Sequence, residues 1–422
     1  MRPDKNTPAH TTGFLAELVC SNSLGSILID RASGLLKEEL RRLGSLLLRC
    51  AEETALPAGG SLAVDRNAFA SRVTEIITQH PYIEVIRSEI KEIPASPTII
   101  ASGPLTSPTL ARSIQALTGA DYLFFYDAIA PVVDFETINM EIVFHGSRFN
   151  HGILTQGDYI NCPLIQSEYE TLVNELINAS KIQLKEFEVD VQKGVRAGSK
   201  HFFEGCLPIE VLASRGKETL AFGPMRPVGL MNPHTGIQPY AVVQLRQDNL
   251  AGTLYNLVGF QTNLKFSEQE RIFRLIPGLE KAEFIRFGQM HRNTFIASPI
   301  LLNNKLQFSH RENLFFAGQI TGTEGYLGNI ASGLITGINA AHLLLGHPLI
   351  TLPKTTMIGG LINYITSADI KDFQPMKANF GIFPKINVKV SGKPQRAALH
   401  VKRALKDLEN FLHTQPDSFR LA

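Results

Sequence analysis

Three glycines in the last third of the chain form its densest candidate binding element. Leu314–Ala317 is an apolar run, and it predicts a short buried strand. Gly318, Gly322 and Gly325 follow in a turn, where the absence of Cβ atoms lets the backbone approach a ligand closely. An apolar helix is expected directly after this turn. A strand, a glycine turn and a helix N-terminus together predict a corner that binds an anion or a cofactor.

Two cysteines are candidates for nucleophilic chemistry, because a thiolate attacks electrophilic carbon. Cys206 stands between Gly205 and Pro208, which predicts a tight turn with an exposed sulfur. Cys20 lies in the segment AELVCSNS. Acidic neighbours such as Glu210 would raise the pKa of a nearby thiol, so hydrogen bonding or proton transfer is their expected role.

The remaining cysteines carry weaker arguments. Cys50 falls in a leucine-rich stretch and is expected to be a small buried hydrophobe, while Cys162 has no chemical argument. No two cysteines have C-x-x-C spacing, so neither a zinc site nor a disulfide framework is predicted.

A polar cluster precedes the glycine turn. His291, Arg292 and Asn293 are consecutive and lie among apolar residues. Such a cluster could bind a flat heterocycle with a carboxylate tail, although a single histidine is more often structural. Arg226 and Arg246 are either contacts for anionic ligands or ordinary surface arginines.

The C-terminal segment is basic. Between Lys377 and Lys406 there is no acidic residue. A phosphate backbone would use such a stripe, but the solvated face of a helix explains it equally well. The eight basic residues are Lys377, Lys385, Lys389, Lys393, Arg396, Lys402, Arg403 and Lys406.

Composition sets the class of protein. The chain has 422 residues, 44% of them apolar and 19% charged, with a net charge of +2. These values are typical of a globular protein of two or three domains and give no global sign of nucleic-acid binding. There is neither an apolar run of transmembrane length nor an N-terminal signal core, so a cytoplasmic location is expected.

The elements that must position these residues follow an α/β pattern. Helices are predicted over residues 30–53 and 67–80, and strands over 85–90 and 98–101, the last ending in Ser102 and Gly103. This alternation favours a parallel sheet with helices on both faces. A neutral, turn-rich stretch then suggests an inserted domain. We expect three segments: residues 1–160, an insertion at 161–282, and residues 283–422, which return to the first domain.

Together these motifs resemble one family, the folate- and flavin-dependent tRNA uracil-5 methyltransferases (TrmFO). The resemblance covers nearly the whole chain and depends on no single motif. The segments that carry it are ELVCSNSL, PAGG, LAVDR, TGADYLFFYDAIAPVV, YINCP, FEGCLPIEVLASRG, FGPMRPVGL, PYAVVQLRQDN, GTLYNLVGFQTNLKF, IPGLEKAEFIRFGQMHRN, FAGQITGTEGY and DFQPMKANFG. Related flavoproteins that modify wobble uridines share the FAGQ and EGY corner but not FEGCLPIE or MHRN, so they fit less well.

The resemblance implies a fold and a reaction. The fold is an FAD-binding Rossmann-like α/β domain of the two-dinucleotide-domain type, with an inserted α+β domain. The reaction moves a one-carbon unit from 5,10-methylenetetrahydrofolate to C5 of the T-loop uridine at position 54 of tRNA. FAD provides the electrons, and NADH or NADPH reduces it again.

The resemblance also implies roles for individual residues. Cys206 is the expected thiolate, and Cys20 is the second functional cysteine. His291 is expected to stack the pterin against the flavin, with Arg292 nearby. The basic tail gains a role in tRNA binding through Lys389, Lys393, Arg396, Lys402 and Arg403. The residues expected at FAD are Gly103, Gly318, Gln319, Gly322, Gly325 and Tyr326, the last beside the isoalloxazine ring.

Two departures from the family pattern qualify these expectations. The family has a strand, a G-x-G-x-x-G turn and a helix before the position of Met1, and this chain shows no such unit. We therefore expect a start assigned too late or a truncated gene. The second departure is Gly328-Asn329, where the family commonly has Glu-Ser.

Two alternative functions stay open at this point. One is a paralogue that methylates uracil in ribosomal RNA, which these motifs do not distinguish from a tRNA enzyme. The other is a truncated, flavin-free form that binds RNA without catalysis.

Overall fold

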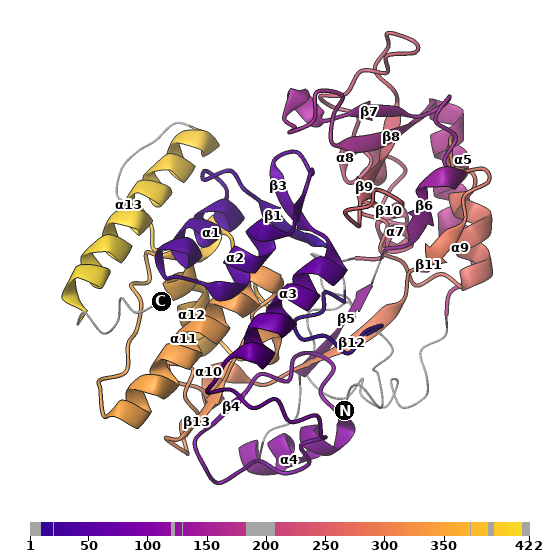
Figure 1. The fold of residues 1–422 in the computed structure, drawn as a ribbon. Coiled ribbons are helices and arrows are strands. Elements are labelled where there is room, and N and C mark those ends of the chain that lie inside the picture. Colours follow the sequence, from indigo (N-terminus) through magenta and orange to yellow (C-terminus); the bar gives the residue numbers. More distant parts are fainter. Residues whose placement is uncertain are drawn as a thin grey trace.

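Two hydrophobic cores organise the chain into two bodies (Figure 1). The structure is a computed structural model, and it describes residues 10–19, 21–119, 123–128, 130–182, 207–371, 373–386 and 392–415, with only the backbone for 123–128 and 290–294. The first core draws on segments from both ends of the chain. The second core lies entirely between Val133 and Ala282.

The predicted strand, turn and helix around the glycines are confirmed. Strand β13 (Leu314–Phe316) pairs in parallel with β4 (Thr98–Ile100). The 3-10 turn η5 (Gly318–Thr321) follows, and α11 (Tyr326–Leu345) then starts at Gly325. Leu314, Phe315 and Phe316 are all buried, as expected for a strand covered on both faces.

The N-terminal region differs from the single helix predicted over residues 30–53. The structure has α1 (Ala32–Arg42) and α2 (Leu46–Glu53) instead. The prediction was wrong because Gly44 takes a left-handed φ of 68° and the Ser45 side chain caps α2 by accepting from the Leu48 N–H. These helices lie beside a small antiparallel sheet of β1 (Ser23–Ser26), β3 (Ser61–Val64) and β2 (Ala55–Leu56).

The helix predicted over 67–80 is confirmed, whereas the strand predicted over 85–90 is wrong. Helix α3 spans Arg66–Gln79 and is capped by Asp65. Residues 85–90 are irregular, because their backbone has no partner strand in the described residues. Helix α4 (Pro108–Thr118) follows β4, and β5 (Leu123–Ala128) pairs antiparallel with β12 (Met290–Phe295).

The second body is built on a six-stranded antiparallel sheet. Its order is β11-β6-β10-β9-β8-β7. Helix α5 (Gln166–Asn178), α7 (Ile209–Ala213), α8 (Thr219–Phe222) and α9 (Phe266–Phe273) belong to this body. The strands are β6 (Val132–Asp134), β7 (Phe144–Gly146), β8 (Tyr159–Leu164), β9 (Ala241–Gln247), β10 (Leu254–Leu257) and β11 (Phe284–Arg286).

This sheet bears on the domain division. Strands β6 and β7 and the first two residues of β8 precede residue 161 and still belong to the second body. We therefore propose that the inserted unit extends from about residue 131 to about residue 287, and the boundaries at 160 and 282 remain a prediction.

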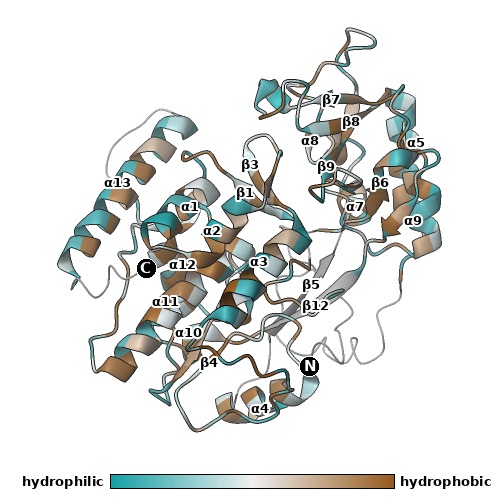
Figure 2. Cartoon of the chain, viewed as in Figure 1, coloured by the Kyte–Doolittle hydropathy of each residue, from teal (hydrophilic) through white to brown (hydrophobic). Residues whose placement is uncertain are grey.

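The last third of the chain returns to the first body. Helices α10 (Ser298–Leu301) and α12 (Met357–Ser367) pack in the first core, and the turn η6 (Phe380–Ile382) leads toward α13. Helix α13 (Lys393–Thr414) alternates hydrophilic and hydrophobic residues along its length (Figure 2). None of the helices in the described ranges is both long and apolar enough to cross a membrane.

A buried carboxyl joins the N-terminal and C-terminal parts of the first body. Glu39 of α1 is fully buried and accepts hydrogen bonds from the backbone N–H groups of Met357 and Ile358, at 2.7 and 2.9 Å. These are the first residues of α12, where N–H groups have no partner within the helix. Burial raises the pKa of Glu39 to about 7, although the two N–H groups oppose that shift.

Glu39 is expected to make stability depend on pH. Its pKa is higher in the folded chain (about 7) than its ordinary value of 4.5, so its contribution is complete below the ordinary value and is lost as pH rises through 7. The free energy of unfolding of the wild type, relative to Glu39→Gln, should fall by about 3 kcal/mol across this window. Denaturant titrations of both proteins at several pH values measure it. A constant difference would show that Glu39 stays ionised when buried.

Candidate functional site

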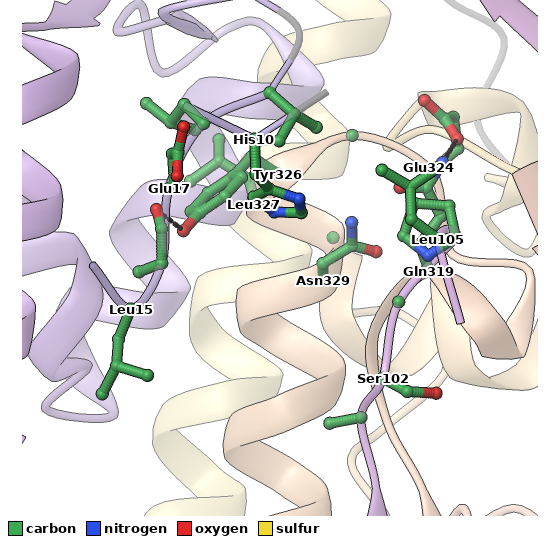
Figure 3. Close-up of a pocket in the computed structure, with 18 of the residues that line it drawn as sticks. His10, Leu15, Glu17, Ser102, Leu105, Gln319, Glu324, Tyr326, Leu327 and Asn329 are labelled. Atoms are coloured by element: carbon green, nitrogen blue, oxygen red, sulfur yellow. Dashed lines mark hydrogen bonds between the residues drawn. The ribbon is translucent and has the colours of Figure 1, made fainter. Parts of the chain in front are cut away.

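One cavity collects most of the residues predicted to bind a cofactor. Its volume is about 1040 Å³, at the upper end of the range for small-molecule and cofactor sites. Gly103, Gln319, Gly325 and Tyr326 all line it. Figure 3 shows the Tyr326 hydroxyl turned toward the N-terminal segment that carries Leu15 and Glu17, with Ser102 and Leu105 on the other side of the cavity.

Two of the glycines leave room for a ligand. Gly103 has a φ of 73°, and a Cβ added there would meet no atom within 4 Å. Gly325 has a φ of 82°, and its only near neighbour would be the Lys377 side chain at 3.8 Å. Both positions favour glycine because of the left-handed backbone. Space beside the backbone at the cavity wall is what close approach of a cofactor requires.

The other two predicted glycines have a different setting, and their contact with a cofactor stays a prediction, although a Cβ on Gly318 would also meet no atom within 4 Å. Neither Gly318 nor Gly322 is among the residues that line the cavity. A Cβ on Gly322 would lie 2.6 Å from the ring of Phe373, so glycine is needed there for packing. The Gly318 N–H donates to Ser332 at 2.9 Å, and its carbonyl accepts from Thr321 and Thr323. These contacts hold the turn in shape behind the cavity.

The start of α11 supplies positive potential. Gly325 provides no side-chain cap, and the first intrahelical bond runs from the Asn329 N–H to the Gly325 carbonyl. The preceding N–H groups therefore have no partner within the helix and favour an anion. Lys377 and Arg87 also line this cavity. The carboxylate of Glu324, which would oppose an anion, accepts from the Gln319 amide at 2.8 Å.

Tyr326 is held in place at the cavity wall. Its hydroxyl donates to the Ala16 carbonyl at 2.8 Å, and its ring meets Phe69 edge-on at 5.8 Å. Burial raises the pKa of the Tyr326 phenol, so it remains a neutral donor. Nearby, the Asn329 side chain points into the cavity (Figure 3), and its Oδ1 accepts from Thr323 at 2.8 Å.

Sequence reasoning missed part of the cavity. The irregular residues 85–90 and the side chains of His10 and Glu17 line it. None of them belongs to a glycine motif or a charge cluster, so no local signal marks them. The helix α4 cap at Ser107 also lines the cavity; a serine before a proline at a helix start is a signal that could have been used.

A buried lysine shapes another wall of the cavity. Lys37 is 3% exposed, and its Nζ donates to the carbonyls of Leu24, Gly25 and Ser26 at 2.7, 3.1 and 3.0 Å. Leu24 and Gly25 line the cavity from β1. Burial, reinforced by the charge of Arg41, lowers the pKa of Lys37 to about 7. The carbonyls of β1 are therefore turned toward the ammonium group.

A buried polar cluster joins the two bodies beside the cavity. Asn22 is completely buried, and its Oδ1 accepts from Arg246 at 2.9 Å and from Asn256 at 3.3 Å. Its amide donates to the carbonyls of Val64, in the first body, and Gln247, in the second. Arg246 lines the cavity and also donates to Ser21 at 2.8 Å.

A second link in this cluster is an ion pair. Asp248 lies next to Asn256 and binds Arg66, the first residue of α3, at 3.0 Å. Both side chains are largely buried. Arg66 also donates to the Leu18 carbonyl at 2.6 Å, so the arginine that pairs with the second body also holds the segment that precedes β1.

The two predicted catalytic cysteines, Cys206 and Cys20, lie outside the described residues, but their neighbours are informative. Val19 and Ser21 both line the cavity. After position 206, the Ile209 N–H donates to the carbonyl of Gln261 at 2.7 Å, and Gln261 also lines the cavity. The segment around position 20, in the first body, and the segment after position 206, in the second body, therefore both reach the same cavity. Cys50 and Cys162 are buried free thiols, which confirms the expectation for Cys50.

Glu210 stabilises the segment that follows position 206. It is 1% exposed and accepts from the Thr262 hydroxyl at 2.8 Å and from the Asn263 N–H at 2.9 Å. Burial raises the pKa of its carboxyl. This arrangement supports the hydrogen-bonding role expected for Glu210 and fixes the loop that carries Gln261.

The predicted pterin residues lie on β12. His291 pairs with Asp127 and Arg292 with Tyr126 across the β5–β12 ladder. The strand is joined to the glycine turn, because the Ile296 N–H donates to the Ile320 carbonyl at 2.8 Å. The role of both residues stays a prediction.

The basic residues predicted to bind RNA separate into two groups. Lys393, Arg396 and Lys402 are exposed on α13. Arg403 instead donates to the carbonyls of Pro384 and Lys385 at 2.7 and 3.2 Å and lies over the Phe383 ring, so it anchors the preceding segment to the helix. Lys389 lies outside the described residues.

Comparisons with known proteins agree with this geometry. The sequence model of the family described as glucose inhibited division protein A matches residues 7–348. The methylenetetrahydrofolate–tRNA-(uracil-5-)-methyltransferase TrmFO of Anoxybacillus flavithermus is 53% identical over 98% of this chain and 92% of its own length. The protein of the same name from Heliobacterium modesticaldum is 53% identical, over 98% and 91%.

Solved structures extend the comparison to the fold. Aquifex aeolicus GidA in its form I crystal superposes with a TM-score of 0.66 at 15% identity, covering 96% of this chain and 71% of that one. The two proteins therefore share one fold.

Removing the shared acceptor of the polar cluster should destabilise the protein. Asn22→Ala leaves the buried donors of Arg246 and Asn256 without this acceptor, and we expect a loss of about 3 kcal/mol in the free energy of unfolding. Denaturant unfolding measures the loss. Asn178→Ala is the matched control, since Asn178 is exposed and bonds only within its own helix. Equal stability of the two variants would contradict a structural role for the cluster.

Proposed function

We propose, because this chain belongs to the glucose inhibited division protein A family and to the TrmFO methyltransferases within it, that it methylates C5 of a uridine in tRNA. The observation that carries the proposal is the shared cavity: Tyr326, Gly103 and the neighbours of Cys20 line it, and Gln261 ties the segment after Cys206 to it. The one-carbon donor is methylenetetrahydrofolate. The target is the T-loop uridine.

The cavity fits FAD in several respects. Its volume suits a large cofactor, and the glycines at 103 and 325 leave backbone surface free for contact. The N–H groups at the start of α11, with Lys377, would hold an anionic part of the cofactor. Gln319, Tyr326 and Asn329 offer polar atoms along the same wall. When bound, FAD supplies the two electrons that convert the transferred carbon into a methyl group, and NADH or NADPH is the proposed source of those electrons.

Cys206 is the proposed nucleophile toward uracil. C5 of uracil is a poor nucleophile until the thiolate adds at C6, which forms a sulfur–carbon bond and places the electron pair on an enolate. C5 of this enolate then attacks the electrophilic methylene carbon of the folate. Loss of the C5 proton expels tetrahydrofolate by breaking its bond to the transferred carbon, which leaves an exocyclic methylene at C5. Addition of a hydride to this methylene, with electrons that a bound reduced FAD would supply, and departure of the thiolate from C6 restore the uracil ring and leave a methyl group at C5. Cys20, between cavity-lining residues, is the proposed partner in proton transfer.

The remaining site residues belong to the substrates. His291 and Arg292 are proposed to bind the folate, the ring by stacking and the carboxylate by charge. The exposed basic residues of α13 are proposed to bind the phosphate backbone of tRNA. A tRNA substrate places the protein in the cytoplasm. Ribosomal RNA is the alternative substrate, and direct assay of both RNAs separates the two.

A methyl-transfer assay tests the proposal. The purified chain, supplied with FAD, methylenetetrahydrofolate and NADH, should show a bound, reducible flavin in the visible spectrum and form 5-methyluridine in a tRNA transcript. Cys206→Ala should keep the flavin spectrum and lose at least about a thousandfold in rate, since nucleophile removal is typically that severe. Cys50→Ala is the control, because that thiol is buried away from the cavity.

The results of this assay distinguish the proposed methyltransferase from the alternative functions. Normal methylation by Cys206→Ala would overturn the nucleophile assignment alone. Absence of a flavin spectrum together with binding of tRNA would favour the flavin-free RNA-binding form.

Binding of tRNA should depend on salt through α13. We expect the triple variant Lys393→Gln, Arg396→Gln and Lys402→Gln to weaken binding and to reduce the slope of log affinity against log salt by roughly 0.7 to 0.9 for each lost phosphate contact. Titrations at several salt concentrations measure the slope. Exposed lysines of the second body, changed as Lys217→Gln, Lys265→Gln and Lys281→Gln, provide a matched control. Equal slopes for both triple variants would exclude α13 from the RNA interface.

A further inference from the structure

Phe149 combines exposure with an unfavourable backbone conformation. It lies in η2 (Arg148–Asn150) with a φ of 55°, and Asn150 after it also has a φ of 55°. A bulky residue is uncommon in this left-handed region, and holding it there costs on the order of 1 kcal/mol or more. The side chain is nevertheless 60% exposed. Burial of the ring therefore contributes little free energy to offset the strain of the backbone.

The Phe149 ring packs with one face against the backbone of Gly229. The Phe149 N–H donates to the Gly229 carbonyl at 2.9 Å. A Cβ on Gly229 would lie 3.1 Å from both Cδ atoms of the ring, so the ring lies across this glycine. Gly229 itself has a φ of 82°. One face of the ring is thus supported by backbone, and a large part of the side chain remains open to solvent.

Two arginines are linked to the segment that carries Phe149. Arg148 donates to the side chain of Gln244 at 3.0 Å and to the carbonyls of Arg226 and Val228. Arg226 is exposed. Among the described residues, neither arginine has a carboxylate within ion-pair distance. Burial, together with the charge of Arg226, lowers the pKa of Arg148 to about 10. The Arg148 guanidinium therefore remains charged at neutral pH.

From these features we propose that Phe149 is a stacking platform for an unpaired base of the RNA substrate, with Arg226 binding an adjacent phosphate. An aromatic face accepts any base by stacking, and a neighbouring arginine binds the backbone. A protein partner would instead need a broader apolar surface with fewer uncompensated charges. The inference rests on the proposed function, since it identifies where the same RNA is held.

The segment that carries Phe149 contacts the first body near the cavity. A Cβ on Gly59 would lie 2.8 Å from the His151 carbonyl, and the Tyr159 hydroxyl donates to the Ala58 carbonyl at 2.9 Å. Ala58 and Gly59 belong to the turn before β3. In the same turn the Gly60 carbonyl accepts a hydrogen bond from the N–H of Ile27, the residue directly after β1. The segment around Phe149 thus contacts the turn before β3, which is hydrogen-bonded to the residue directly after β1, and β1 lines the cavity.

Substitution with glycine separates the two possible roles of the ring. Phe149→Gly relieves the left-handed backbone, so we expect an unchanged or higher melting temperature. If the ring stacks on a base, the dissociation constant for a tRNA transcript should rise between about fivefold and about 150-fold. Phe149→Tyr keeps the ring and should bind as the wild type does. A ring that serves only in packing would give the reverse pattern, with a lower melting temperature and unchanged tRNA binding.

Controls distinguish failure of this inference from failure of the proposed function. Tyr82→Ala removes another aromatic ring, 91% exposed, on the first body, and should leave tRNA binding unchanged. Wild-type binding and methylation with an unaffected Phe149→Gly variant would overturn the platform and leave the function intact. A wild-type chain that binds no tRNA would overturn both.

Discussion

The contact between the two bodies at Asn22 is the constraint on which the site depends. One amide accepts from Arg246 and Asn256 and donates to carbonyls of both bodies. Buried donors of this kind are destabilising unless each one finds a partner, so the cluster tolerates only one arrangement of β1 against β9. That arrangement sets the cavity, because Ser21 and Ser23 flank Asn22 and Arg246 faces it from the other body. The segment next to Cys20 is held by the same constraint.

The chemistry proposed for the cavity follows from its unequal walls. The α11 wall is polar and positive, with free N–H groups, whereas the N-terminal wall carries the Ala16 carbonyl and the carboxylate of Glu17. Burial alone would raise the pKa of Glu17, but the hydrogen bonds from Thr11 and Thr12 together lower it. Glu17 is therefore ionised at neutral pH, and the N-terminal wall is negative. A cofactor with an anionic part and a flat neutral ring suits such a division, and its anionic part would face α11.

Local patterns predicted the elements whose signals are contained within a few residues. The strand, turn and helix from Leu314 to Leu345 were predicted correctly, because apolar runs and glycines determine them locally. The break at Gly44 was missed, because leucines continue on both sides of it. The contacts of Gly322 with Phe373 and of Arg403 with the Pro384 carbonyl were not predicted, and a ligand contact of either residue stays a prediction. Those partners lie well away in sequence, so no local pattern identifies them.

Residues with a left-handed backbone serve different roles, and the atoms around each one decide which. Gly103 and Gly322 share nearly the same conformation. At Gly103 an added side chain would meet nothing, so the position is open to a ligand, whereas at Gly322 it would meet an aromatic ring. Phe149 reverses the case, since a bulky residue occupies a conformation suited to glycine and still exposes its ring. Packing does not explain why Phe149 keeps this strained backbone, because its ring stays largely exposed. Contact with the proposed RNA base gives the ring a physical role.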